Sequence, residues 1–175
     1  MAVNKRGDIR WFATDPRAII PLDERFHISH GLKRALKKSL FSITINQDFA
    51  AVIEACSVSH GETWISKEII RSYSELHERG FAHSVEARVD GELAGGLYGV
   101  ALGGAFFGES MFHRATDASK AALVALVERL RDRGYSLLDT QWTTPHLMQF
   151  GALEIPQTEY LQLLQGALGR QCHFE

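Results

Sequence analysis

Cysteine is scarce in this sequence and long apolar runs are missing, and each shortage excludes a class of protein. The two cysteines, Cys56 and Cys172, lie far apart and match no metal-binding or redox spacing. No apolar run approaches the roughly 20 residues that a membrane-spanning helix needs. The N-terminal residues 1–10 are polar and contain no apolar signal core. These absences predict reduced cysteines, no membrane span and a cytoplasmic location.

The sequence also lacks a strong excess of charge of either sign. Its 19 Lys and Arg and 21 Asp and Glu give a net charge of −2. Proteins that bind nucleic acid through its phosphates are usually basic overall, so an RNA partner would require a local basic patch. The 175 residues, 45% of them hydrophobic, suffice for one domain with a sizeable core.

One predicted helix carries such a patch. Ser29 is a good N-cap, and Leu32, Leu36 and Leu40 recur at helical spacing, so they should face inward. The opposite side carries the cations Lys33, Arg34, Lys37 and Lys38. Cations on one face suit the phosphates of an RNA stem, which is recognised by shape and not by sequence. An ordinary solvated helix face is the alternative.

The rest of the chain shows strand and helix patterns in a definite order. The expected strands are 18–22, 41–46, 82–89, 93–101, 105–110 and 136–141. The expected helices are 29–38, 66–80, 117–133 and 158–168. Tight turns at 90–91 and 103–104 should join three of the strands into an antiparallel meander.

A meander followed by a long helix, a strand and a further helix is typical of α+β folds. The order resembles that of GCN5-related acyltransferases. We therefore predict an α+β fold with a GCN5-related N-acetyltransferase-like core and a short N-terminal arm. Residues 1–62 should form an N-terminal segment with the basic helix, and residues 63–175 the catalytic domain.

Polar residues near two strand ends are candidates for catalysis. Asp139 and Gln141 are two positions apart on one expected strand, so their side chains should share a face. A carboxylate there could orient or deprotonate an amine, whereas an amide is no useful base and would form hydrogen bonds. A carboxylate that caps a loop is the alternative. Glu109 has apolar neighbours, so it needs a cationic partner, which could be a ligand or Arg114, or a raised pKa.

Several segments, taken in order, resemble the leucyl/phenylalanyl-tRNA–protein transferase family. The most specific are GELAGGLYGV at 91–100 and GESMF at 108–112. The others are DPRA at 15–18, ETWI at 62–65, AHSVE at 82–86, ASK at 118–120, LDTQ at 138–141 and GALEIP at 151–156. The resemblance covers nearly the whole chain, from Trp11 to about Leu164. Relative to the usual family pattern, the N-terminal region is expected to be short.

The resemblance implies an aminoacyltransferase. Family members move Leu, Phe or Met from aminoacyl-tRNA to the α-amino group of proteins that begin with Arg or Lys, which marks those proteins for degradation. The co-substrate is aminoacyl-tRNA, and no other cofactor is implied. No metal is expected either, because His27 and His30 have no third ligand nearby. A monomer is expected, and acceptors with N-terminal Asp or Glu remain the alternative.

The resemblance also implies roles for individual positions. Asp139 and Gln141 take the catalytic positions. From the residues themselves we also expect Glu109 to act in catalysis and the four cations of the basic helix to bind tRNA. The pocket for the donor amino acid and its adenosine is implied to contain Phe12, Trp64, Tyr73, Leu97, Phe106 and Leu126. Core packing is the alternative for the apolar members, above all for Leu126, which lies at helical spacing from Leu123.

Two other functions compete with this one. An acetyl-CoA-dependent N-acetyltransferase would share the fold but needs a glycine-patterned pyrophosphate loop. Residues 107–120 read FGESMFHRATDASK, without that pattern, and Glu109 and Asp117 would repel a pyrophosphate. A non-catalytic binder of tRNA or of protein N-termini is disfavoured because Asp139 and Gln141 are both present.

Overall fold

The computed structural model describes residues 2–3, 9–10, 13–38, 40–59 and 64–175. The strands of the main sheet are β3 (Arg17–Ile20), β4 (Ser42–Ile45), β5 (Ala82–Val89), β6 (Glu92–Leu102), β7 (Ala105–His113), β8 (Leu137–Gln141) and β9 (Leu153–Ile155). The helices are α1 (His30–Lys37), α2 (Phe49–Val58), α3 (Lys67–Glu78), α4 (Ala118–Asp132), α5 (Pro145–Met148) and α6 (Gln157–Leu168). A separate two-stranded sheet consists of β1 (Ala2–Val3) and β2 (Ile9–Arg10). Within these ranges, no helix has the length and apolar character needed to cross a membrane.

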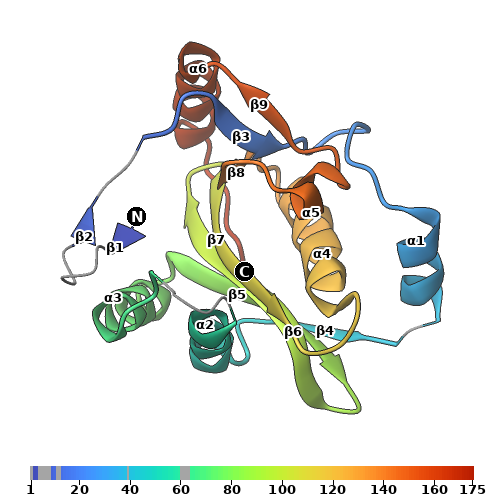
Figure 1. Ribbon diagram of the computed structural model, residues 1–175. Helices are drawn as coiled ribbons and strands as arrows, with labels where there is room; N and C mark the ends of the chain where they lie inside the picture. The colour runs from blue at the N-terminus through green and yellow to red at the C-terminus, as the bar shows by residue number, and fades with distance from the viewer. Residues whose placement is uncertain (1, 4–8, 11–12, 39, 60–63) are drawn as a thin grey trace.

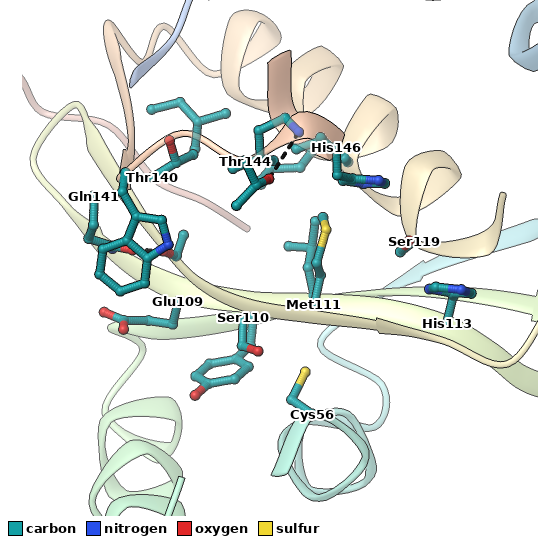
Figure 2. A pocket seen from close by; sticks show the side chains of 18 of the residues that line it. Cys56, Glu109, Ser110, Met111, His113, Ser119, Thr140, Gln141, Thr144 and His146 are labelled. Atoms are coloured by element: carbon teal, nitrogen blue, oxygen red, sulfur yellow. Dashed lines mark hydrogen bonds between the residues drawn. The ribbon is translucent and has the colours of Figure 1, made fainter. Parts of the chain in front are cut away.

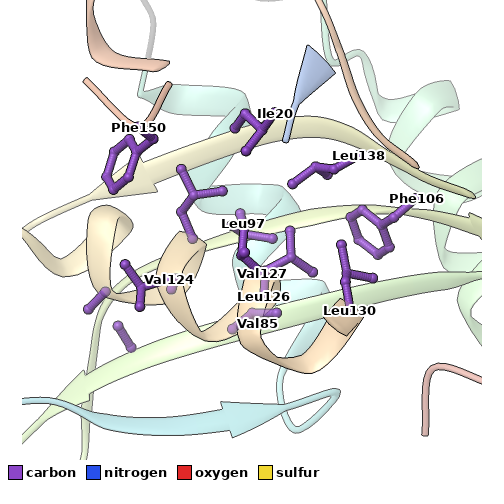
Figure 3. Close-up of a cluster of buried hydrophobic side chains, with 14 of the residues drawn as sticks. Ile20, Val85, Leu97, Phe106, Val124, Leu126, Val127, Leu130, Leu138 and Phe150 are labelled. Atoms are coloured by element: carbon purple, nitrogen blue, oxygen red, sulfur yellow. The ribbon is translucent and has the colours of Figure 1, made fainter. Parts of the chain in front are cut away.

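The main sheet has seven strands in the order β4-β5-β6-β7-β8-β3-β9, and helices cover both of its faces (Figure 1). Because side chains alternate along a strand, neighbouring residues pack into hydrophobic cores on opposite faces of the sheet. Leu97 of β6 packs under α4, whereas Tyr98 packs under α2 and α3. In β8, Leu138 faces the α4 core and Leu137 faces α6. Figure 3 shows the core beneath α4, which is the largest of the three.

Local sequence signals placed most elements correctly. The hydroxyls of Ser29 and Ser66 cap α1 and α3, each accepting from the backbone N–H three residues later. Gly80 follows α3 with a φ of 76°, as expected for a helix end. The turn at 90–91 has positive φ at both residues, 51° and 83°, which suits a tight hairpin. The predicted α+β fold and its order of meander, long helix, strand and helix are confirmed.

Two predictions about the N-terminal part were wrong or incomplete. Leu40, expected to face inward with Leu32 and Leu36, is 52% exposed, because α1 ends before it. Helix α2 was not predicted from the sequence. Its inner residues include Val52 and Ile53, both fully buried, yet apolar residues surround most of this helix. A helix that is apolar on nearly all sides shows little periodicity, so the pattern gives no signal.

The first part of the chain contributes directly to the main sheet. β3 lies between β8 and β9, and β4 pairs with β5 at the other edge. Both strands come from the part of the chain assigned above to a separate N-terminal segment. The division between residues 62 and 63 stays a prediction, because residues 60–63 lie outside the described ranges.

The last residues of the chain return to the core. Phe174 is 3% exposed and stacks on His83 and Phe106, with ring centroids 4.3 and 5.3 Å away. Arg129 of α4 lies over the Phe174 ring and donates from Nε to its carbonyl oxygen at 2.6 Å. This ring therefore ties the C-terminal residues to β5, β7 and α4.

We expect Phe174→Ala to lower the free energy of unfolding by about 3 kcal/mol, because it leaves a cavity among buried rings. Urea denaturation followed by circular dichroism measures this loss. Phe81→Ala is the matched control, since Phe81 is 42% exposed, and it should cost under about 1 kcal/mol. Equal losses in the two variants would show that the C-terminal residues do not stabilise the core.

Candidate active site

The candidate site lies where two parallel strands part. β7 and β8 are paired only over Ala105–Phe107 and Leu137–Asp139. Beyond this point β7 stays with β6, while β8 stays with β3. A cavity of about 560 Å³ occupies the space between the diverging strands (Figure 2). This volume lies within the range of small-molecule sites.

A β-bulge in β7 shapes one wall of this cavity. Tyr98 pairs with Ser110 and Gly99 pairs with Gly108, so Glu109 is the extra residue. A bulge bends its strand and redirects the side chain, which here brings Glu109 to the cavity. Gly99 permits the close packing at this point, because a Cβ there would collide with the Phe107 carbonyl oxygen and the Phe106 ring on β7.

Most of the cavity wall beneath α4 and α5 is apolar. It consists of Leu97, Met111, Leu123, Leu126, Leu138 and Leu147. These residues come from β6, β7, α4, β8 and α5, so the whole fold is needed to assemble the wall. An apolar ligand group buried there would gain roughly 25 cal/mol for each Å² removed from water. A charged group at this end would lose its hydration without gaining a partner.

Glu109 and Gln141 bring polar groups to the cavity, one from each diverging strand (Figure 2). The Gln141 Nε2 donates to the Gly108 carbonyl oxygen at 2.8 Å and so bridges the gap between the strands. Burial raises the pKa of Glu109, while a hydrogen bond from the Tyr73 hydroxyl acts in the opposite direction. The effect of desolvation on the Glu109 pKa therefore exceeds the opposing effect of its neighbours.

Three buried polar atoms of the cavity lining have no hydrogen-bond partner among the described residues. They are the hydroxyl oxygens of Tyr98 and Thr140 and the Nε2 of His146. A buried polar group without a partner costs about 1–3 kcal/mol. Burial also lowers the pKa of His146, so its ring is neutral near pH 7. The cavity therefore offers hydrogen-bonding groups that a polar ligand could satisfy.

Asp139 lies behind the cavity and does not line it. Its side chain is fully buried and accepts from Arg17 Nη2 at 2.6 Å, from the Tyr160 hydroxyl at 2.7 Å and from the Gln141 backbone N–H at 2.8 Å. The prediction that Asp139 and Gln141 share a face is wrong, because Gln141 has a φ of 64° and leaves the extended strand conformation. The catalytic role of Asp139 stays a prediction.

Only some of the residues implied to form the pocket line the cavity. Trp64, Leu97 and Leu126 line the cavity. Tyr73 does not line it, although its hydroxyl contacts a carboxyl that does. Phe106 packs in the core beneath α4 against the C-terminal residues and also lies away from the lining.

The remaining predicted site residues are Phe12 and the four cations of the basic helix. Phe12 lies outside the described residues. The four cations of α1 are exposed on a helix that packs beside α4. They are Lys33, Arg34, Lys37 and Lys38. Their role in binding RNA stays a prediction.

The structure also bears on three other expectations, which concern a partner for Glu109, the cysteines and a metal site. Arg114 donates to the Leu93 carbonyl oxygen and lies over the Phe112 ring, and within the described residues it forms no ion pair with Glu109. Both cysteines are free. In the described part of the chain, no three His, Cys, Asp or Glu side chains cluster as a metal site would require.

Sequence reasoning missed the residues that follow β8. Thr140, Trp142, Thr144 and His146 all line the cavity. Thr144 Oγ1 accepts from the Leu147 backbone N–H at 3.2 Å and caps α5, whose first residue is proline. A threonine followed by proline is a recognisable helix start and could have revealed this short helix. Trp142, which is 52% exposed, directly follows Gln141 and could have been noticed for that reason.

Comparison with known proteins identifies one family that this chain resembles over most of its length. A sequence model of the family described as leucyl/phenylalanyl-tRNA protein transferase matches residues 19–165. A leucyl/phenylalanyl-tRNA–protein transferase from Herpetosiphon aurantiacus is 58% identical over 170 residues, which are 97% of this chain and 87% of that protein. One from Akkermansia muciniphila is 57% identical over 173 residues, 98% of this chain and 90% of that protein.

Among solved structures, L-PGS from Bacillus licheniformis has a similar fold, with a TM-score of 0.52. The match covers 78% of this chain and 48% of that protein. At 15% sequence identity, the likeness concerns the fold alone.

The raised pKa of Glu109 predicts how stability changes with pH. Because the folded protein binds this proton more tightly than the unfolded chain, stability present below about pH 4 is lost as the pH rises through the folded pKa. Glu109→Gln removes this titration, so we expect a higher Tm than the parent at pH 7 and an equal Tm near pH 4. Glu54→Gln, at an exposed site, is the control. A Glu109→Gln protein less stable than the parent at pH 7 would contradict the interpretation.

Proposed function

Because the chain belongs to the leucyl/phenylalanyl-tRNA–protein transferase family, we propose that it transfers an amino acid to proteins that begin with Arg or Lys. Family membership makes the chain an aminoacyltransferase that uses leucyl- or phenylalanyl-tRNA. The basic acceptor, the use of Met as a third donor and the marking of acceptors for degradation are the proposed parts. The observation that supports an apolar donor and a basic acceptor is the cavity between β7 and β8, which is apolar at one end and acidic near Glu109.

The apolar wall suits the donor amino acid. Leu, Phe and Met have apolar side chains without a branch at Cβ, and six leucine and methionine side chains line this end of the cavity. Leu97 and Leu126 approach from β6 and α4, on either side of the space. Burial of the donor side chain between them would fix the ester at the mouth of the apolar end, where the polar groups begin.

The reaction exchanges an ester for an amide. The acceptor nitrogen attacks the ester carbonyl carbon, the ribose oxygen leaves, and a proton from the amine ends on that oxygen. An α-amine has a pKa of about 7.7–8.0, so a useful fraction is neutral at cytoplasmic pH, and orientation matters more than a strong base. The Gln141 amide oxygen can accept a hydrogen bond from the amine. The ester already supplies the driving force, so the proposed reaction uses aminoacyl-tRNA as co-substrate and no metal or other cofactor.

Glu109 is the reason to propose a basic acceptor. It is the one acidic side chain among the described residues that line the cavity. A carboxylate in this position attracts an ammonium or guanidinium group and repels the side chain of an N-terminal Asp or Glu. Binding of a cation would also offset the desolvation that raises the pKa of Glu109.

The basic face of α1 is proposed to bind the tRNA. Its four cations are exposed, and no acidic residue interrupts them within the helix. They supply the local patch that a chain with a net charge of −2 needs for an RNA partner. The same proposal includes a cytoplasmic location, where aminoacyl-tRNA is available, and a monomeric enzyme.

A transfer assay tests the proposed reaction. Purified protein is mixed with radiolabelled leucyl-tRNA and with peptides that begin with Arg, Lys, Asp, Glu or Ala. We expect label on the Arg and Lys peptides only, because Glu109 favours a cationic acceptor. Transfer to the Asp or Glu peptides would overturn the acceptor class while preserving the chemistry. Absence of transfer to every peptide would overturn the function.

The tRNA surface is tested by removing two charges. We expect Lys37→Gln/Lys38→Gln to weaken leucyl-tRNA binding and to reduce the slope of log affinity against log salt by about 1–2, one unit for each lost phosphate contact. Filter binding at several salt concentrations measures both effects. Arg71→Gln/Arg79→Gln, in α3 and at its C-cap, removes equal charge from exposed sites and is the control. The same slope in both double variants would exclude α1 as the tRNA surface.

A further inference from the structure

We propose that Arg17, Tyr160 and Thr14 are positioning residues for the transfer reaction. Together with Asp139 they hold Gln141 in the backbone conformation that presents its amide to the cavity. The inference rests on the role proposed above for Gln141. It extends the site to three residues outside the cavity lining and gives Asp139 an indirect role.

The backbone of Gln141 is unusual for its residue type. Its φ is 64°, in the left-handed region. The other described non-glycine residues with positive φ are Asn46, Asp90 and Asp117, and short Asn and Asp side chains tolerate this conformation. Glutamine lacks that advantage, so surrounding contacts must hold it there. Such outliers are found where a particular side chain is needed in a particular place.

Hydrogen bonds fix Gln141 at three points. Its backbone N–H donates to Asp139 Oδ1 at 2.8 Å, and its carbonyl oxygen accepts from Thr14 Oγ1 at 2.9 Å. Its side-chain Nε2 donates to the Gly108 carbonyl oxygen at 2.8 Å. The first two bonds fix the peptide groups on both sides of the Cα atom. The third fixes the plane of the amide, which leaves Oε1 as the acceptor for a substrate.

Asp139 can hold this peptide because its own position is fixed. Arg17 donates from Nε and Nη2 to both carboxylate oxygens, at 3.0 and 2.6 Å for the shortest bonds to each. The Tyr160 hydroxyl donates to Oδ2 at 2.7 Å, and the guanidinium lies 5.1 Å from the centre of the Tyr160 ring. Arg17 comes from β3 and Tyr160 from α6, so two elements remote in sequence orient one carboxylate.

The same contacts make Asp139 a poor base for the acceptor amine. Its oxygens already accept from Arg17, Tyr160 and the Gln141 backbone, which occupies the lone pairs of a carboxylate. It is fully buried and does not line the cavity. Asp139 therefore acts through Gln141, and Arg17 and Tyr160 act through Asp139.

A double-mutant cycle on kcat tests this order of action. Tyr160→Phe removes one donor to Asp139 and keeps the ring. Alone, it is expected to lower kcat about five- to tenfold with little change in the KM for leucyl-tRNA. In a Gln141→Ala background, Tyr160→Phe should change kcat by less than about twofold, because the group it positions is gone. Equal factors in the two backgrounds would overturn the proposal and leave Tyr160 a structural role.

Hydrogen exchange provides a readout that does not depend on activity. In Tyr160→Phe, the Gln141 backbone amide should exchange at least about tenfold faster by NMR than in the parent, while amides in α4 keep their rates. Tyr135→Phe removes a buried hydroxyl elsewhere and is the matched control for both measurements. Unchanged exchange at Gln141 would overturn the positioning role even if activity fell.

Thr14 is tested by a conservative pair. Thr14→Ser keeps the hydroxyl and should keep kcat and slow exchange, whereas Thr14→Val removes it and should lose both. Equal behaviour of the two variants would exclude the hydroxyl contact. If the parent protein showed no transfer activity, the proposed function would be overturned. The hydrogen-exchange results would still test whether Gln141 is positioned as proposed. Full activity of Gln141→Ala would overturn the role on which the inference rests.

Discussion

The parallel hydrogen-bond ladder between β7 and β8 stops after Phe107 and Asp139, and the site exists because of that early end. On one side the bulge at Glu109 adds a residue and bends β7. On the other, left-handed Gln141 ends β8. Backbone groups that would have paired across the gap need other partners, and the Gly108 carbonyl accepts from the Gln141 side chain at 2.8 Å. The opening in the sheet is therefore stabilised by a side chain that also belongs to the site.

Two adjacent residues of β8 have different roles, because one lies in a hydrogen-bond network behind the cavity and the other lies in the cavity wall. Asp139, behind the cavity, is paired with Arg17 and Tyr160, and a fully paired network of this kind holds one geometry. The next residue, Thr140, has a hydroxyl in the cavity wall without a partner in the described part of the chain. Side chains alternate along a strand, so the two groups are kept on opposite sides by the backbone itself. The paired side positions the site, and the unpaired side remains free to bind a substrate.

The parts of this arrangement that depend on local chemistry could be predicted from the sequence. Ser29 caps its helix as expected, because the cap is made within one turn. The helix Phe49–Val58 could not be predicted from periodicity, since most of its surface is apolar. Gln141 was identified through its family motif, but its conformation was not. The pairing of Arg17 with Asp139 joins residues 122 positions apart, and no local pattern specifies a contact that only the completed sheet creates.

Both residues proposed to meet the acceptor are held in states that are unfavourable without it. Gln141 has a strained backbone, and Glu109 is a partly buried carboxyl whose pKa is raised by desolvation. An incoming ammonium group relieves the second condition, because its charge replaces the lost hydration of the carboxylate. The cationic side chain of an N-terminal Arg or Lys would supply this charge, and the α-amine itself would stay free to attack the ester. The burial that raises the pKa of Glu109 is thus the property that suits this cavity to a basic acceptor.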